Sequence, residues 1–257
     1  MGFVTHSILC LMWQFAYCIN SYQNKSLCSS RIYEKDFIDR SVAMEKIFWS
    51  NPYQHTLDTK IISINGNEIL LEKTIAFSFS GGQESDRAFI NGLEVLSSRI
   101  DGNLIYYTLP DDHNLAPNDV ITMTIDWPRR YRLMRLHFAA ELILELVTRT
   151  SMLEKVGAHI SESKARIDFK ANFNISTIFS QLLDEYNAII RQDLVIHKGY
   201  HDVTNQRRFW KIDGFAEVPC GGTHVHSTSE VGFIRLKRSH PGKAIERIEI
   251  TLMDDSR

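Results

Sequence analysis

The sequence predicts an α+β fold in which a small N-terminal β-barrel-like module precedes an α+β domain with an antiparallel sheet and a long helix. Two patterns support this prediction. Short alternating strands with turns roughly ten residues apart fill residues 44–128, and an apolar period of three and four residues begins after Trp127-Pro128. We therefore expect three segments: an extension (1–43), the β module (44–128) and the α+β domain (129–257).

Turn residues divide the first module into short strands. Three turn signals place a glycine after a small polar residue: Asn65-Gly66, Asn91-Gly92 and Asp101-Gly102. Apolar or alternating stretches beside them predict strands, at 61–64, 69–71, 104–109 and 120–125. Gly81-Gly82-Gln83 interrupts the alternation and indicates a loop.

The period changes in the second module. One set of apolar residues recurs at helical spacing and predicts a helix of about five turns: Leu133, Leu136, Ala140, Leu144 and Val147. A second helix is expected over 174–192, with Ser176 or Thr177 as its N-cap. Alternation returns after it and predicts β structure at 209–218, 233–236 and 245–252, with a turn at His240–Lys243.

Composition and charge narrow the classes of function. The chain has 257 residues, of which 44% are hydrophobic and 23% charged, so it can bury a sizeable core and is not a disordered chain. The net charge of -2 excludes a surface that is basic throughout, so a nucleic acid would have to meet a local basic patch. No apolar run reaches the roughly 18–20 residues of a membrane span.

Residues 1–43 differ from the rest of the chain. The apolar run Ile8–Ile19 has the length of a signal-peptide core, but no positively charged segment precedes it. A poorly ordered tail, or a start codon assigned upstream of a true start at Met44, is favoured over a targeting segment. Only Cys220 lies outside this segment, so the body of the chain cannot form a disulfide scaffold, and a reducing compartment, the cytoplasm, is expected.

Four residues form a candidate metal-ligand set. His137 and Glu141 lie one turn apart on the first helix, so both side chains could reach one ion. In Cys220-Gly-Gly-Thr-His224 the glycines permit a sharp turn that lets the thiol and the imidazole converge. Cysteine and histidine are typical zinc ligands. The alternative, equally weighted on these residues alone, is a core histidine, a solvated glutamate and an inert buried cysteine.

A group of arginines precedes His137 at the start of the same helix: Arg129, Arg130, Arg132 and Arg135. Such a run is usually a solvated helix start. The functional hypothesis is contact with RNA phosphates, since a protein without overall positive charge needs that charge concentrated near its site. Arg207-Arg208 and Lys237-Arg238 would extend this patch.

Several segments resemble the freestanding alanyl-tRNA editing proteins, the AlaX family, which are related to the editing domains of alanyl- and threonyl-tRNA synthetases. The resemblance covers the chain from about Met44 to its end. It rests on Met134–Glu141 (MRLHFAAE), Gly157–Phe169 (GAHISESKARIDF) and Gly214–Val225 (GFAEVPCGGTHV), together with Thr74 and the glycine-rich segment at 81–87.

The resemblance implies hydrolysis of the ester that joins a wrong amino acid, typically serine or glycine, to alanine tRNA. It also implies one zinc ion held by His-x-x-x-His and Cys-x-x-x-His. His137, Cys220 and His224 match this pattern, whereas Glu141 stands where the second histidine belongs. A carboxylate can also bind zinc; preference for another divalent ion and loss of the metal are the alternatives. Gln83 and Thr74 are expected to line the pocket.

Three functions are thus compatible with the sequence. The first is a metal-dependent aminoacyl-tRNA deacylase that edits in trans, since nothing resembles the ATP-binding motifs of a synthetase. The second is a non-catalytic tRNA-binding relative with a degenerate metal site. The third is a hydrolase of another ester. We expect the first, with tRNA as the partner.

Overall fold

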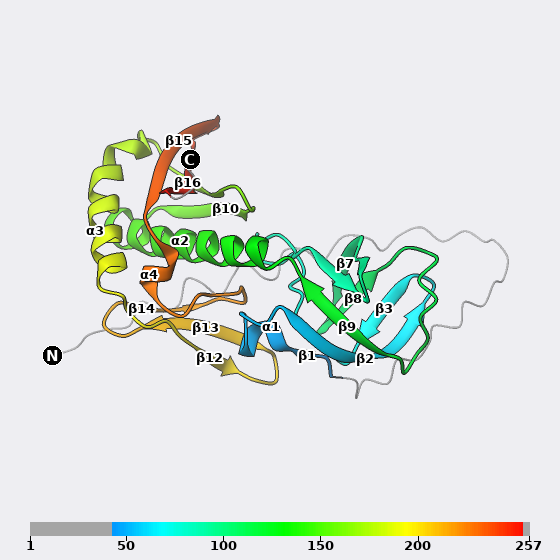
Figure 1. The fold of residues 1–257 in the computed structure, drawn as a ribbon. Coiled ribbons are helices and arrows are strands. Elements are labelled where there is room, and N and C mark those ends of the chain that lie inside the picture. Colours follow the sequence, from blue (N-terminus) through cyan, green and yellow to red (C-terminus); the bar gives the residue numbers. More distant parts are fainter. Residues whose placement is uncertain (1–42, 254–257) are drawn as a thin grey trace. The chain divides into compact units, whose positions relative to one another are not determined.

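The computed structural model describes residues 43–253, which form a mixed α+β structure (Figure 1). The interpretations of the extension before Ala43 therefore lie outside the described residues. In the part of the chain that is described, no helix is long and apolar enough to cross a membrane.

A seven-stranded antiparallel sheet occupies the first half of the described chain. Its strands are β2 (Thr56–Asn65), β3 (Glu68–Leu71), β5 (Ala88–Ile90), β6 (Leu93–Glu94), β7 (Ser97–Asp101), β8 (Leu104–Thr108) and β9 (Val120–Ile125). They lie in the order β6-β5-β9-β2-β3-β8-β7. Its end strands β6 and β7 have no backbone pairing with each other among the described residues, so closure into a barrel stays a prediction. Two further short strands pair in parallel, β1 (Glu45–Lys46) and β4 (Lys73–Thr74). Strand β1 leads directly into helix α1 (Ile47–Ser50), and β4 follows β3 in the chain.

The turn residues explain how these strands are connected. Gly66, Gly92 and Gly102 all have positive φ, which glycine adopts without steric cost. They stand between β2 and β3, β5 and β6, and β7 and β8, so each of the three expected turns is present.

Helix α2 (Trp127–Ser151) is the central element of the second half. The side chain of Asp126 accepts a hydrogen bond from the backbone N–H of Arg129 and caps its N-terminus. A four-stranded antiparallel sheet packs against α2, in the order β10 (Glu154–Ile160), β11 (Ala165–Lys170), β16 (Ile245–Leu252) and β15 (Ile234–Gly242). Phe138 of α2 also packs against Trp210, which belongs to a separate three-stranded sheet, with ring centroids 5.1 Å apart. Because elements pack against it from more than one direction, α2 is buried on most sides.

That other sheet has three strands, β12 (His197–Asp202), β13 (Arg207–Ile212) and β14 (Ala216–Pro219). The remaining elements are the 3-10 helix η1 (Ile175–Ile178), α3 (Phe179–Arg191) and α4 (Thr228–Val231).

Two sequence-based expectations need correction. The segment expected as one helix over 174–192 starts as η1, and Asn174, not Ser176 or Thr177, caps it by accepting a hydrogen bond from the N–H of Ser176. The stretch 209–218 is a hairpin, because Gly214 adopts a positive φ between β13 and β14.

An ion pair joins the glycine-rich segment to the start of α2. The side chains of Arg130 and Asp86 are both fully buried, and the Arg130 guanidinium also donates to the carbonyls of Pro52 (3.0 Å) and Ile75 (2.6 Å). Each of its three nitrogens donates at least one hydrogen bond inside the protein. The hypothesis that Arg130 contacts RNA is therefore wrong, because its side chain does not reach the surface.

The glycine-rich loop at Gly81–Gln83 also contacts β10. Gln83 pairs with Ile160 in a parallel bridge, and the N–H of Ile160 donates to the carbonyl of Gly82 at 2.7 Å. A Cβ on Gly82 would lie 2.7 Å from the carbonyl oxygen of Ala158, so only glycine permits this approach. The glycine-rich loop is thus fixed between α2 and β10.

We predict that Arg130→Met lowers the free energy of unfolding by about 3–5 kcal/mol, because it leaves the buried Asp86 carboxylate without its charged partner. Urea unfolding followed by circular dichroism measures this. Arg87→Gln is the matched control, since the Arg87–Glu94 pair lies on the surface, and it should change stability little. Equal losses in the two variants would contradict the structural role given to Arg130.

Candidate metal centre

Three of the four predicted ligands lie together. The ligand atoms of His137, Cys220 and His224 are all within 4.8 Å of one another. The Nε2 atom of His137 is 3.2 Å from the Cys220 Sγ, and the Nε2 atom of His224 is 3.3 Å from it. Helix α2 supplies the first residue, and the loop between β14 and α4 supplies the other two.

The loop reaches α2 so closely because of one glycine. A Cβ on Gly222 would lie 2.5 Å from His137 Nε2 and 2.9 Å from Gln83 Oε1, which no real side chain allows. The neighbouring Gly221 has no atom within 4 Å of such a Cβ. The backbone N–H of Cys220 donates to the Arg208 carbonyl at 2.9 Å and attaches the loop to β13. Gly222, and not Gly221, is therefore the residue that permits the approach.

Burial sets the protonation of the three groups. Desolvation lowers the pKa of His137, and it lowers that of His224 well below the ordinary value, so both imidazoles are neutral at pH 7. Desolvation raises the pKa of the Cys220 thiol well above its usual range, and the charge of Glu141 raises it further. Without a metal ion the site is a neutral thiol between two neutral imidazoles.

This donor set fits a zinc ion. Two imidazole nitrogens and one sulfur converge in a buried place, which is a typical combination of zinc ligands. The Nδ1 atoms of both histidines are buried without a hydrogen-bond partner among the described residues. Each ring therefore has its only close polar contact at Nε2, the nitrogen that faces the sulfur.

Glu141 lies beside this group and not in it. Its carboxylate accepts a hydrogen bond from Trp210 Nε1 at 3.0 Å, and it is absent from the set of converging ligand atoms. Its charge still acts on the site, since it raises the pKa of both Cys220 and His137. The arrangement is thus three converging donors with a carboxylate nearby.

Gln83 contacts the same loop. It is fully buried, its Nε2 donates to Thr223 Oγ1 at 2.9 Å, and its Oε1 accepts from the Thr223 N–H at 3.3 Å. The glycine-rich loop thereby places an amide group directly beside Gly222 and the metal-ligand group.

Thr74 is fully buried in the module of the seven-stranded sheet. Its hydroxyl is 2.6 Å from the Tyr107 hydroxyl, accepts from the Ala76 N–H and points to Met123 Sδ. None of these partners belongs to the metal-ligand group. Thr74 supports the chain that leads into the glycine-rich segment.

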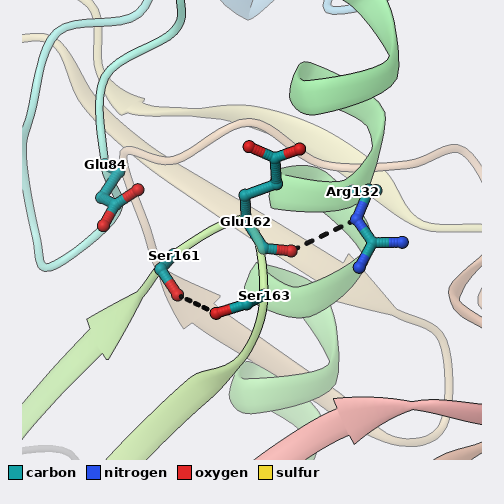
Figure 2. Close-up of a pocket in the computed structure, with 5 residues that line it drawn as sticks. All are labelled: Glu84, Arg132, Ser161, Glu162 and Ser163. Atoms are coloured by element: carbon teal, nitrogen blue, oxygen red, sulfur yellow. Dashed lines mark hydrogen bonds between the residues drawn. The ribbon is translucent and has the colours of Figure 1, made fainter. Parts of the chain in front are cut away.

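The other three arginines of the predicted patch are partly exposed and engaged. Arg129 pairs with Glu84 and Glu162, and Arg135 donates to the Val231 carbonyl. Arg132 Nε donates to the Glu162 carbonyl at 3.2 Å at the edge of an open pocket of about 450 Å³ (Figure 2). The pocket is lined by Glu84, Arg132, Ser161, Glu162 and Ser163, so its charge is mixed.

Three residues that shape the site are absent from the sequence-based prediction. Thr223 holds Gln83, Trp210 holds Glu141, and Lys198 donates to the His224 carbonyl at 3.5 Å. Thr223 could have been selected because it stands inside the Cys-x-x-x-His segment. Trp210 and Lys198 carried no signal, because only the fold of the three-stranded sheet brings them to the site.

Comparisons with known proteins identify the family of this chain. Residues 208–249 match the family described as the threonyl and alanyl tRNA synthetase second additional domain. The alanyl-tRNA editing protein AlaX-M of Pyrococcus horikoshii is 32% identical over 213 residues, covering 80% of this chain and 97% of the relative. AlaX-M of Saccharolobus solfataricus is 28% identical, covering 81% and 98%.

A much longer relative shares only one region. The alanine–tRNA ligase of Methanococcus aeolicus is 28% identical over 230 residues, which are 80% of this chain but 25% of the ligase. The chain thus matches the AlaX-M proteins over nearly their whole length and the ligase over a quarter of it. It belongs to the family of the freestanding AlaX-M alanyl-tRNA editing proteins.

Proposed function

We propose that this protein is a zinc-dependent deacylase that hydrolyses mischarged tRNA, with serine or glycine wrongly attached to alanine tRNA as the substrates. The observation that carries this proposal is the convergence of His137, Cys220 and His224 beside the buried amide of Gln83. Membership of the AlaX-M family supports it.

The reaction needs only water as the second reactant. Water attacks the ester carbonyl, the bond between that carbon and the ribose oxygen breaks, and the free amino acid and the tRNA are released. His137, Cys220 and His224 would hold a zinc ion, which would supply a Lewis acid that can orient the aminoacyl group or polarise a water. His137 and His224 are buried, whereas Cys220 is partly exposed.

We propose that Gln83 and Thr223 contact the aminoacyl group. The two hydrogen bonds between them hold the Gln83 amide in one orientation, so its oxygen stays beside Gly222. A site that hydrogen-bonds a hydroxyl discriminates well against a substrate that lacks it, which would separate serine from alanine. Thr74 would act indirectly, through the chain that enters the glycine-rich loop.

The position of Glu141 is the observation that supports a second candidate function, a non-catalytic tRNA-binding relative. The carboxylate is engaged with Trp210 and so does not offer a fourth protein ligand in this arrangement. Three ligands with an open position are typical of catalytic zinc sites, which makes the deacylase the better-supported function.

We predict that the purified protein binds about one zinc ion per chain and that Cys220→Ala abolishes this binding. Glu141→Gln should keep the zinc, because Gln keeps the size of the side chain and Glu141 lies outside the ligand group. Inductively coupled plasma mass spectrometry of dialysed protein measures the metal. Substoichiometric zinc in the wild type would support the non-catalytic candidate instead.

We predict that Gly222→Ala lowers the rate of deacylation of serine-charged alanine tRNA by at least about 100-fold, because its Cβ would displace His137 and Gln83. Gly221→Ala is the matched control in the same loop and should retain activity, since its Cβ enters open space. Release of labelled serine measures the rate. Comparable rates in the two variants would contradict the role of Gly222 in shaping the site.

We predict that zinc affinity rises about tenfold for each pH unit between pH 6.5 and 8. The raised pKa keeps the Cys220 thiol protonated in this range, so each bound ion must displace one proton. The lowered pKa values leave both histidines neutral, so they add no further proton. Titration against a chromophoric chelator at several pH values measures the slope, and a flat profile would mean that the thiolate already exists without metal.

A further inference from the structure

Three cationic side chains surround the outer side of the Cys220–His224 loop. Lys198 of β12 donates to the His224 carbonyl at 3.5 Å, and Arg208 of β13 donates to the Gly222 carbonyl at 3.3 Å. Lys46 of β1 lies with its Nζ 4.5 Å from the Trp49 ring, and Arg208 Cζ is 5.3 Å from the same ring. Cations from three separate strands therefore meet beside the candidate metal centre.

Two aromatic rings belong to this cluster. Trp49 Nε1 donates to the Gly221 carbonyl at 2.8 Å, which fixes the indole against the loop. The Tyr200 ring is 6.4 Å from the Trp49 ring at 81°, and Arg208 Cζ lies 5.5 Å from the Tyr200 ring. Tyr200 is 42% exposed, so one part of this aromatic surface faces solvent.

No carboxylate forms an ion pair with the cations of this cluster among the described residues, although the charge of Glu230 acts on Lys198. Among residues 43–253, none of Lys46, Lys198 and Arg208 forms an ion pair, and their hydrogen-bond partners are an amide, carbonyls and His226. Arg208 is 5% exposed, and its Nε has no partner among the described residues. A buried guanidinium without an acidic partner is costly, and an anionic ligand would supply the missing negative charge.

Burial is already unfavourable for one of these cations. Desolvation lowers the pKa of Lys46 to about 8, although its ammonium donates to Gln206 Oε1 at 2.7 Å. Phosphate groups carry the negative charge that such a cluster lacks, and nucleic acid bases stack on aromatic side chains. Cations interleaved with exposed aromatic rings are typical of surfaces that bind single-stranded RNA.

We propose that Lys46, Lys198, Arg208, Trp49 and Tyr200 bind the single-stranded 3′ end of the tRNA, with phosphates against the cations and a base against Tyr200. This inference rests on the proposed function and adds to it the place where the nucleotide next to the ester is held. The surface adjoins the loop that carries Cys220 and His224, so an RNA end bound here brings its terminal ribose to the candidate metal centre.

The test is binding, not hydrolysis, so that it is independent of the deacylase proposal. The probe is a 5′-labelled C-C-A trinucleotide without an amino acid, measured by fluorescence anisotropy over a series of salt concentrations. Tyr200→Ala should weaken binding about fivefold or more through lost stacking. Lys198→Gln should weaken it and reduce the salt slope by about 0.7, the value for one phosphate contact on a single strand.

Two matched controls lie on the same chain away from the cluster. Lys170→Gln and Phe173→Ala alter an exposed lysine and an exposed aromatic residue, and both should bind the trinucleotide like the wild type. Circular dichroism confirms that each variant is folded. A hexaglutamate peptide should not compete, because it offers charge without bases.

The proposal is overturned if Tyr200→Ala and Lys198→Gln bind like the controls, or if the peptide competes as well as the RNA. It is also overturned if the wild type does not bind the trinucleotide. A protein that binds this RNA through the cluster but releases no serine would keep the RNA surface and refute the deacylase.

Discussion

The contact between Gly222 and His137 is the constraint on which the candidate site depends. The loop backbone lies so close to α2 that a single added carbon would reach 2.5 Å from the imidazole nitrogen. This approach brings the sulfur of Cys220 and the ring of His224 to His137, although α2 and the loop are far apart in the sequence. It also brings the amide of Gln83 against Thr223. The ligand set and the neighbouring polar contacts therefore share one packing requirement.

The two halves of the described chain contribute to the site through buried polar contacts. The Arg130–Asp86 pair and the Gly82–Ile160 hydrogen bond hold the glycine-rich loop, and the loop in turn holds Gln83 at Thr223. Such contacts are directional, so they specify one position of the loop where apolar packing alone would allow several. The cost of burying this charge is offset because each of the three guanidinium nitrogens of Arg130 donates to a protein oxygen.

Charge is distributed in two zones around the loop. On the inner side, the ligands are neutral and Glu141 is tied to Trp210. On the outer side, Lys198 and Arg208 contact the loop's own carbonyls and have no acidic partner among the described residues. A protein with a net charge of -2 thus concentrates positive charge where an anionic substrate would approach. The arginine run at the start of α2, which looked like the phosphate-binding segment, is largely engaged with acids and carbonyls instead.

The sequence by itself determined the α+β class, the hairpin turns at Gly66, Gly92 and Gly102, the long helix after Pro128 and three of the residues that converge at the candidate metal centre. Each of these depends on local spacing or on residue chemistry, which periodicity and motif order express directly. Only the tertiary structure decided that Arg130 is buried, that Glu141 bonds to Trp210, and that the Thr74 hydroxyl contacts Tyr107. Burial and long-range partners depend on which elements pack together in the folded protein, and the spacing of residues along the sequence does not specify that packing.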